Sequence, residues 1–256
     1  MTNLLPPNRG ELLVAADSDS LTRLAAHLVR AWVAEAAKTN HDGIARIAIS
    51  GGSTPRAMNK LLATMSVPWA ATEWFWVDER AVPMASPRSN SGAAQDDLFS
   101  HLKVQPRGVH AMQGDHADLD DAARAYEKIL GTSFGIQPLA SGGVGLPAFD
   151  LLLLGIGDDG HTASLFPGGD QVEITDRWVV PVPAAEGREA RITLTRPVIT
   201  AARRVVVLAQ GEAKRGPIEL ARGPGALREI PSRLTQEVRG ELLWLIDAAA
   251  RPASPG

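Results

Sequence analysis

The stretch that decides the fold is FDLLLLGIGDDGHTASLFP, at residues 149–167. It opens with an unbroken apolar run, which is typical of a strand buried on both faces of a parallel sheet. The glycines and acidic residues that follow end this strand in a turn. A short helix is then expected to begin at His161 and to end at Pro167. An imidazole is thereby placed just beyond the carboxyl end of a central strand, where open α/β sheets bind their ligands.

The residues of this stretch leave three interpretations open. His161 could satisfy a hydrogen bond in a buried turn, as many histidines do. The pattern Gly-x-Gly-x-x-Gly at residues 155–160 also matches the dinucleotide-binding motif. A pyrophosphate, however, needs a full helix whose amino end points at it, and Asp158 and Asp159 would repel such a ligand. In the third interpretation His161 is a general base, and Asp159 is close enough to hold its ring.

Size and composition narrow the class of protein. The chain has 256 residues, a net charge of -3 and 45% hydrophobic residues, which fits a single α/β domain over residues 1–256 with a flexible tail at about 251–256. It has no cysteine, which excludes disulfides and thiolate metal sites and favours a reducing compartment. No apolar stretch approaches the ~18 residues of a membrane span, and residues 1–10 do not resemble a signal peptide. The near-neutral charge argues against a nucleic-acid partner.

Predicted strands alternate with predicted helices along the whole chain, which indicates a mostly parallel sheet covered on both faces. Four polar segments directly follow predicted strands, at residues 50–54, 78–80, 155–161 and 211–214. Because the carboxyl ends of parallel strands lie at one edge of the sheet, these segments are expected to meet there.

The first of these segments reads as an anion-binding loop at the start of a helix. Two glycines let the backbone approach a ligand closely, and Pro55 is expected at the first helical position. The free N–H groups of such a helix end suit an anion, although an ordinary capped turn has the same sequence signature. The segment consists of Ser50, Gly51, Gly52, Ser53 and Thr54. It lacks the Gly-Lys-Ser/Thr ending of a P-loop, so ATP is not indicated.

Two cations in the other segments suit a phosphate. Arg80 offers a planar fork for bidentate binding, although it could instead pair with its acidic neighbours. Lys214 is expected near a helix amino terminus, where a bound anion would offset its unfavourable interaction with the helix dipole, or where it could simply be solvated. Together the segments predict a pocket for a small phosphorylated molecule, with His161 beside the reacting atom.

Several motifs then carry a family resemblance. In chain order they are ISGGSTP at residues 49–55, VDERAVP at 77–83 with Ser89-Asn90, GIGDDGHTASLFP at 155–167, RITLT at 191–195, and Gly211-x-x-Lys214. Through these motifs nearly the whole chain resembles the 6-phosphogluconolactonases. The resemblance implies a Rossmann-like three-layer α/β/α sandwich with a mostly parallel sheet, similar to glucosamine-6-phosphate isomerase. It also implies a cytoplasmic enzyme that hydrolyses 6-phospho-D-glucono-1,5-lactone to 6-phospho-D-gluconate in the oxidative pentose phosphate pathway, without a metal or organic cofactor.

The residues that match the family's motifs are the expected site. His161 is expected as the general base that activates water, with Asp159 orienting its ring. The residues expected to bind the substrate and its phosphate are Ser50, Gly51, Gly52, Ser53, Thr54, Asp78, Arg80, Asn90, Gly157, Arg191 and Lys214. The expected partner is the phosphosugar lactone alone, with no nucleic acid and no membrane, in a monomer or weak homodimer.

Two segments of the chain differ from those of related proteins. Relatives often carry Ser-Pro-Lys-Pro before the RITL strand, whereas residues 182–187 are Val-Pro-Ala-Ala-Glu-Gly here, so the resemblance does not carry over a basic contact between the loop at residues 183–190 and the substrate. Aminosugar-phosphate isomerases carry Asn-Glu-Pro after the motif histidine. This chain has Leu165-Phe166-Pro167, and phenylalanine cannot transfer a proton. That isomerase or deaminase activity, and a non-catalytic sugar-phosphate-binding domain, are the alternatives.

Overall fold

The computed structural model describes residues 9–138 and 145–253. The expectation about a signal peptide falls mostly on residues 1–8, and half of the expected tail on residues 254–256, so these parts lie outside the described residues. Within the described part of that tail, the backbone N–H of Ala253 donates to Glu219 Oε1 at 2.7 Å.

The centre of the molecule is a seven-stranded sheet in which every pairing is parallel. Its order is β1 (Glu11–Ala15), β10 (Glu241–Asp247), β9 (Arg204–Ala209), β6 (Leu151–Leu154), β2 (Ala45–Ile49), β3 (Thr72–Trp76) and β5 (Gly108–His110). The chain runs outward from β2 through β3 to β5, and outward in the other direction from β6 through β9 to β10. The order therefore reverses between the neighbours β2 and β6, which is where open α/β sheets form a ligand crevice.

A second, antiparallel sheet stands beside the first. It contains β4 (Asp78–Arg80), β8 (Arg191–Leu194) and β7 (Val179–Val182), in the order β4-β8-β7. The sequence predicted strands along the whole chain, but it did not predict a separate sheet. Residues 78–80 follow β3 as expected, yet they form an edge strand of this sheet. Arg80 is thereby paired in register with Arg191.

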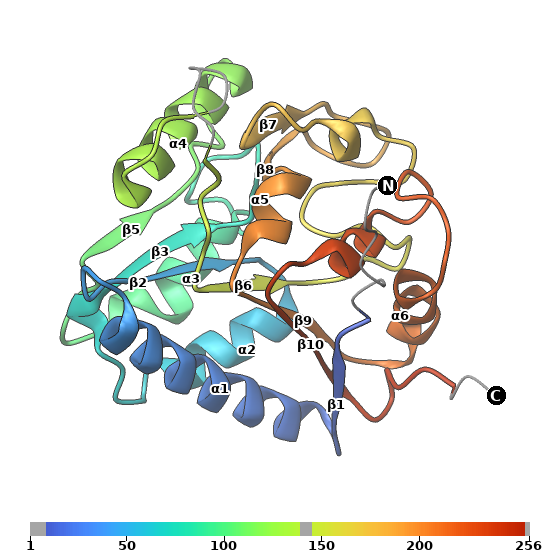
Figure 1. The fold of residues 1–256 in the computed structure, drawn as a ribbon, viewed down its shortest axis with the longest axis horizontal. Coiled ribbons are helices and arrows are strands. Elements are labelled where there is room, and N and C mark those ends of the chain that lie inside the picture. The colour runs from blue at the N-terminus through green and yellow to red at the C-terminus, as the bar shows by residue number, and fades with distance from the viewer. Residues whose placement is uncertain (1–8, 139–144, 254–256) are drawn as a thin grey trace, which may run out of the picture.

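Helices cover both faces of the main sheet. They are α1 (Ser18–Thr39), α2 (Ser53–Leu62), α3 (Asn90–Asp97), α4 (Leu119–Phe134), α5 (Arg196–Ala201) and α6 (Arg215–Arg222), with short 3₁₀ helices at Trp69–Ala71, Phe99–His101, Asp170–Glu173, Glu212–Lys214 and Pro231–Glu237. Figure 1 shows α1 and α2 on one side of the sheet, and α4, α5 and the β7–β8 pair on the other. The predicted three-layer α/β/α fold with a mostly parallel sheet is confirmed.

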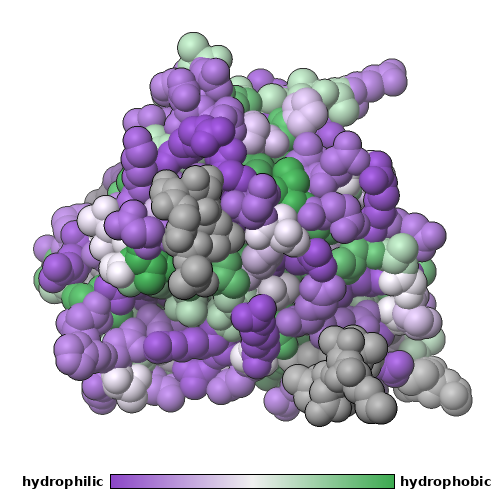
Figure 2. Space-filling model, turned by 45° about the horizontal axis from the view of Figure 1, so that its top comes forward, coloured by the Kyte–Doolittle hydropathy of each residue, from purple (hydrophilic) through white to green (hydrophobic). Residues whose placement is uncertain are grey.

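The surface is mainly hydrophilic where it is seen in Figure 2, and hydrophobic residues form small groups separated by hydrophilic ones. Among the described residues, the large hydrophobic side chains that are exposed are Met84, Val104, Val109 and Leu220, and only Val104 and Val109 lie near each other in the sequence. None of the helices in residues 9–138 and 145–253 is long and apolar enough to cross a membrane.

Two local predictions were wrong. The helix expected after His161 is instead a turn, closed by a bridge between Thr162 and Leu165. Ala163 has a φ of 51°, and this left-handed backbone interrupts any helix. Helix α2 begins at Ser53 rather than at Pro55, because Gly52 takes the capping position with a φ of 116° that suits glycine.

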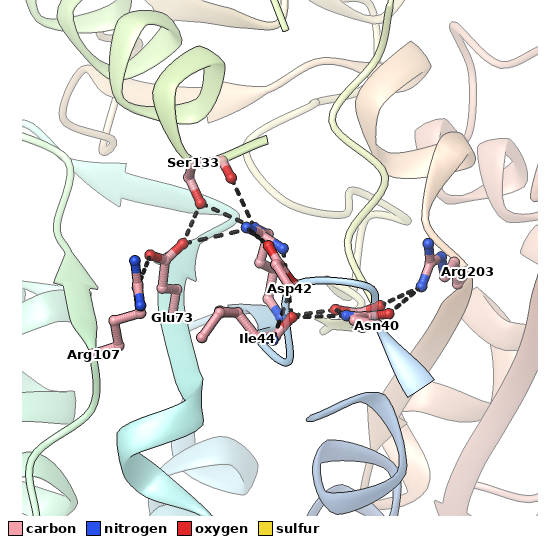
Figure 3. A network of polar contacts seen from close by, with 9 residues as sticks. Asn40, Asp42, Ile44, Glu73, Arg107, Ser133 and Arg203 are labelled. Carbon is pink, nitrogen blue, oxygen red and sulfur yellow. Dashed lines mark hydrogen bonds and ion pairs between the residues drawn. The ribbon is translucent and has the colours of Figure 1, made fainter. Parts of the chain in front are cut away.

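A polar network ties the strands together at the amino-terminal edge of the sheet (Figure 3). The buried carboxylate of Asp150, just before β6, accepts hydrogen bonds from Arg46 N, Asn40 Nδ2 and Arg203, each at 2.8 Å. The side chain of Arg46 continues the network, because its Nε donates to Ser133 O on α4 at 3.0 Å. The edge opposite the carboxyl ends of the strands is therefore held by charges and backbone groups together.

Removing the Asp150 carboxylate should destabilise the fold. We expect Asp150→Ala to lower the free energy of unfolding by about 2–4 kcal/mol, because three donors at a buried position lose their acceptor. Glu35→Ala removes one of the two exposed carboxylates that pair with Arg204 and should change stability by at most about 1 kcal/mol. Urea denaturation measures both, and equal losses in the two variants would contradict the importance of this network.

Candidate active site

A cavity of about 260 Å³ lies at the carboxyl ends of β2, β3, β6 and β9. His161 lines this cavity, and so do all eleven residues that the sequence predicted to bind the substrate. The lining comprises Ser50, Gly51, Gly52, Ser53, Thr54, Pro55, Asp78, Arg80, Asn90, Gly155, Ile156, Gly157, His161, Ala163, Arg191, Leu208, Ala209, Gln210 and Lys214. Asp159 is the one predicted site residue that does not line the cavity, and it contacts His161 instead.

The His161 ring is held by Asp159. Asp159 Oδ1 lies 2.6 Å from His161 Nδ1 and also accepts the backbone N–H of His161 at 3.0 Å. Burial raises the pKa of Asp159, but the hydrogen bond from His161 N–H and the attraction of the imidazole outweigh it, so this pKa lies below its ordinary value. Asp159 is therefore ionised at neutral pH and fixes Nδ1 as the nitrogen that faces it, which leaves Nε2 for the cavity.

Gly157 makes room for this pair. A Cβ at Gly157 would lie 2.0 Å from His161 Nδ1 and 2.6 Å from Asp159 Oδ1. The backbone of the same residue closes the turn, since Gly157 N donates to His161 O at 2.8 Å and Gly160 N donates to Gly157 O at 3.0 Å. Gly157 is thus explained by the close packing of the imidazole against the backbone, and Gly160 by its φ of 84°, so neither glycine needs a dinucleotide to account for it.

An aromatic ring and an arginine support the other side of the imidazole. The centroid of the Phe166 ring lies 4.6 Å from that of His161. The guanidinium carbon of Arg188 lies 3.5 Å from the centre of the Phe166 ring, within the range of a cation–π contact. Arg188 belongs to the loop from which the sequence implied no basic contact. Its contact is with the Phe166 ring beside the imidazole, and a motif comparison does not reveal this stacking.

The glycine loop after β2 presents the start of α2 to the cavity. A Cβ at Gly51 would lie 1.8 Å from Asn90 Oδ1, so glycine is required where the Asn90 amide packs on the loop. Asn90 Nδ2 donates in turn to Asp78 O at 3.0 Å. No side chain of the described residues caps α2 at Gly52, which leaves the first N–H groups of this helix for another acceptor. The loop therefore suits an anion.

The second sheet supplies two arginines to the cavity wall. Arg191 lies 3.7 Å from Asp78 Oδ2, and Ser164 Oγ donates to the same carboxylate at 2.5 Å. The Nε atoms of Arg80 and Arg191 are buried, and neither has a hydrogen-bond partner in the part of the chain that the structure describes. Burial lowers the pKa of Arg191; Asp78 opposes this shift and the neighbouring Arg80 adds to it. Two adjacent guanidinium groups with unused donors favour a polyanionic ligand.

A buried carboxylate keeps Arg80 and Asn90 in place. Glu79 accepts the backbone N–H groups of Arg80 and Asn90 at 2.8 Å through Oε1, and that of Ser91 at 2.7 Å through Oε2. It thereby holds the start of α3 against β4. Glu79 was not among the site residues predicted from the sequence, because its importance comes from contacts that no local pattern predicts.

Lys214 lines the cavity from the segment after β9 and forms an ion pair with Asp158. Its Nζ lies 2.6 Å from Oδ1 of Asp158, whose side chain is 72% exposed, whereas that of Lys214 is 26% exposed. The sequence left open whether Lys214 faces an anion or only solvent. The structure pairs it with a carboxylate of the chain itself.

The arrangement separates two chemical environments within one cavity. A helix start and three cations can hold a polyanion, and an imidazole fixed by a carboxylate can accept a proton nearby. Residues 9–138 and 145–253 contain no group of three or more His, Cys, Asp or Glu side chains that could hold a metal ion.

Gln210 lines the cavity but was not predicted from the sequence. It directly follows β9, so the rule that ligands bind at the carboxyl ends of parallel strands would have indicated it.

Comparisons with known proteins show which family the chain resembles over most of its length. The family model described as glucosamine-6-phosphate isomerases/6-phosphogluconolactonase matches residues 16–244. The chain is 38% identical over 209 residues to 6-phosphogluconolactonase from Synechocystis sp., covering 81% of this chain and 84% of that protein. It is 37% identical to probable 6-phosphogluconolactonase 1 from Arabidopsis thaliana, covering 95% and 93%.

A solved structure shows the same likeness. The 6-phosphogluconolactonase from Trypanosoma cruzi superposes with a TM-score of 0.81 at 27% identity, covering 94% of this chain and 95% of that one. The family resemblance inferred from the sequence motifs is confirmed.

The packing at Gly157 can be tested directly. We expect Gly157→Ala to displace the imidazole and to lower kcat by about 10- to 1000-fold in whatever reaction the cavity catalyses, because a methyl group would overlap His161 Nδ1. Gly216→Ala on α6 is the matched control, since a Cβ there meets no atom within 4 Å. Steady-state kinetics on both variants, with circular dichroism to verify folding, would contradict this account if Gly157→Ala retained full kcat.

Proposed function

The chain belongs to the family of glucosamine-6-phosphate isomerases and 6-phosphogluconolactonases, and we propose that its activity is that of a 6-phosphogluconolactonase. The substrate is 6-phospho-D-glucono-1,5-lactone and the product is 6-phospho-D-gluconate, in the oxidative pentose phosphate pathway. The observation that carries the proposal is the cavity in which the Asp159-held imidazole and the cationic wall of Arg80, Arg191 and Lys214 occur together.

In the proposed mechanism His161 acts as a general base. A water molecule loses a proton to Nε2 as its oxygen attacks the lactone carbonyl carbon, and the resulting imidazolium returns that proton to the ring oxygen when the ester bond breaks. Asp159 is the positioning residue, because its carboxylate holds Nδ1 and stabilises the positive charge of the imidazolium. A lactone carbonyl is already electrophilic, so the reaction as proposed requires neither a metal nor an organic cofactor.

The phosphate of the substrate is assigned to the glycine loop and the cations. Its oxygens accept N–H groups from the loop of residues 50–54 at the start of α2, and bind Arg80, Arg191 and Lys214. Ser50 contributes mainly to the architecture of the loop, because its hydroxyl donates to Leu153 O at 2.8 Å. Asn90, Asp78 and Gly157 act in the proposal by shaping the loop, the arginine pair and the imidazole.

The alternatives within the family differ at the residue after Leu165. An aminosugar-phosphate isomerase of the kind considered above needs a proton-transferring side chain there, whereas Phe166 packs against His161 and Arg188. The structure therefore favours hydrolysis. We also propose a single domain, a cytoplasmic location supported by the absence of cysteine, and a monomer or weak homodimer without nucleic-acid or membrane partners.

The central test is proton release after addition of freshly prepared 6-phospho-D-glucono-1,5-lactone. The protein should accelerate acid formation over the spontaneous rate, and His161→Ala should lower kcat by about 10²–10⁴-fold with little change in KM, because the general base is lost. A pH-stat measures both quantities.

The same samples distinguish the alternatives. A non-catalytic binding domain would bind 6-phosphogluconate without accelerating acid release, and an isomerase would release ammonia from glucosamine 6-phosphate. Near-normal kcat in the His161→Ala variant would refute the role of the imidazole.

The phosphate site predicts a different kinetic signature. Arg80→Ala should raise KM for the phosphorylated lactone by about 10- to 100-fold, because a charge-assisted, bidentate contact is lost. Arg88→Ala is the matched control: this exposed arginine pairs with Glu189, and only its backbone carbonyl contacts Arg80. The two variants should hydrolyse unphosphorylated glucono-1,5-lactone as the unchanged protein does. Equal hydrolysis of the two lactones by the unchanged protein would contradict a phosphate site.

A further inference from the structure

The ion pair between Lys214 and Asp158 involves one of the cations to which the proposed phosphate is assigned. Lys214 lines the cavity, and its Nζ lies 2.6 Å from Asp158 Oδ1. Asp158 does not line the cavity. Its carboxylate approaches from the turn that also carries Asp159 and His161, and its side chain is largely in solvent. A carboxylate from the turn that carries His161 is thus paired with the ammonium group of Lys214, which the loop after β9 contributes to the site.

We propose that Asp158 sets the affinity of the site for phosphate by competing with it for Lys214. The inference rests on the proposed function, in which Lys214 is a phosphate-binding residue. A phosphate that reaches Lys214 must displace the Asp158 carboxylate or share the ammonium group with it, and sharing places two like charges close together. Either event weakens binding of the phosphate relative to a site without Asp158.

The ion pair is suited to such an exchange. Pairs with an exposed carboxylate contribute little to stability, so a dianion can replace Asp158 without disturbing the fold. The turn that carries Asp158 is held independently, through the hydrogen bonds between Gly157 and His161 and between Gly160 and Gly157. Displacement of the Asp158 side chain therefore need not move the imidazole.

A weakened phosphate contact has a kinetic consequence. Substrate and product carry the same phosphate, so this contact binds both equally and does not accelerate the chemical step. By competing for Lys214, Asp158 favours release of the product and raises KM to a similar extent. Asp158 is thus a residue that determines affinity, distinct from the imidazole that carries the chemistry and from Asp159, which positions it.

The test is Asp158→Asn, which keeps the size of the side chain and removes its charge. We expect KM for the phosphorylated lactone, and the dissociation constants of 6-phosphogluconate and inorganic phosphate measured by calorimetry, each to fall by about 3- to 10-fold at low ionic strength. The rate constant kcat should stay the same or decrease. Hydrolysis of unphosphorylated glucono-1,5-lactone should not change.

Two further variants make the test specific. In a Lys214→Gln background Asp158→Asn should have no effect on phosphate affinity, because the residue for which the two anions compete is gone. Glu241→Gln alters one of the two exposed carboxylates that pair with Arg204, at the opposite edge of the sheet, and should leave all these constants unchanged. An equal effect of Asp158→Asn with and without Lys214 would show direct repulsion and overturn the proposal.

The outcomes also separate this inference from the proposed function. If the unchanged protein binds 6-phosphogluconate and hydrolyses the lactone, but Asp158→Asn leaves affinity unaltered or weakens it, then Asp158 does not compete and the inference alone fails. Weaker binding in that variant would mean that Asp158 positions Lys214 for the phosphate. If the unchanged protein neither binds 6-phosphogluconate nor hydrolyses the lactone, the proposed function and the inference fail together.

Discussion

The parallel pairing of β2 with β6 is the constraint on which the rest of the structure depends. Ile47 and Ala48 of β2 pair with Leu151 and Leu152 of β6, and the chain order reverses at this point of the sheet. The two following loops must therefore diverge to opposite faces, which opens a crevice between them. One loop is the glycine turn at the start of α2, and the other carries His161. The proposed anion site and the proposed proton acceptor are neighbours because two buried apolar strands are neighbours.

Much of this could be predicted from the sequence, because it depends on local patterns. Apolar runs of four to six residues gave the central strands, and their carboxyl ends located the four polar segments. All predicted binding residues line the cavity, since a parallel sheet leaves few other places for residues that directly follow its strands. Asp159 follows His161 into the site because the two residues belong to one tight turn, and the structure adds the contact between their side chains.

The remaining features could not be predicted because they depend on contacts between distant segments. In the second sheet β4 pairs with β8, which lies more than a hundred residues later in the chain, and no periodic pattern in the sequence predicts that pairing. Glu79 was read as one of three adjacent charges, yet its burial makes it the acceptor that holds β4 to α3. The turn after His161 was expected to be a helix because its composition allows one, whereas the φ of Ala163 is imposed by its surroundings.

Each acidic residue of the site pairs with a different group and therefore has a different electrostatic effect. Asp78 lies against Arg191 and Ser164, and Asp159 lies against the imidazole, so each carboxylate is fixed by the group whose position it determines. The lowered pKa of Asp159 means that its contribution to stability is present above the pKa of the unfolded chain and is lost only as the pH falls through its folded value. The orientation of His161 therefore persists to acidic pH. Asp158, one residue earlier and largely exposed, does not hold the imidazole. A single turn can therefore fix the imidazole through Asp159 and contact the loop after β9 through the ion pair between Asp158 and Lys214.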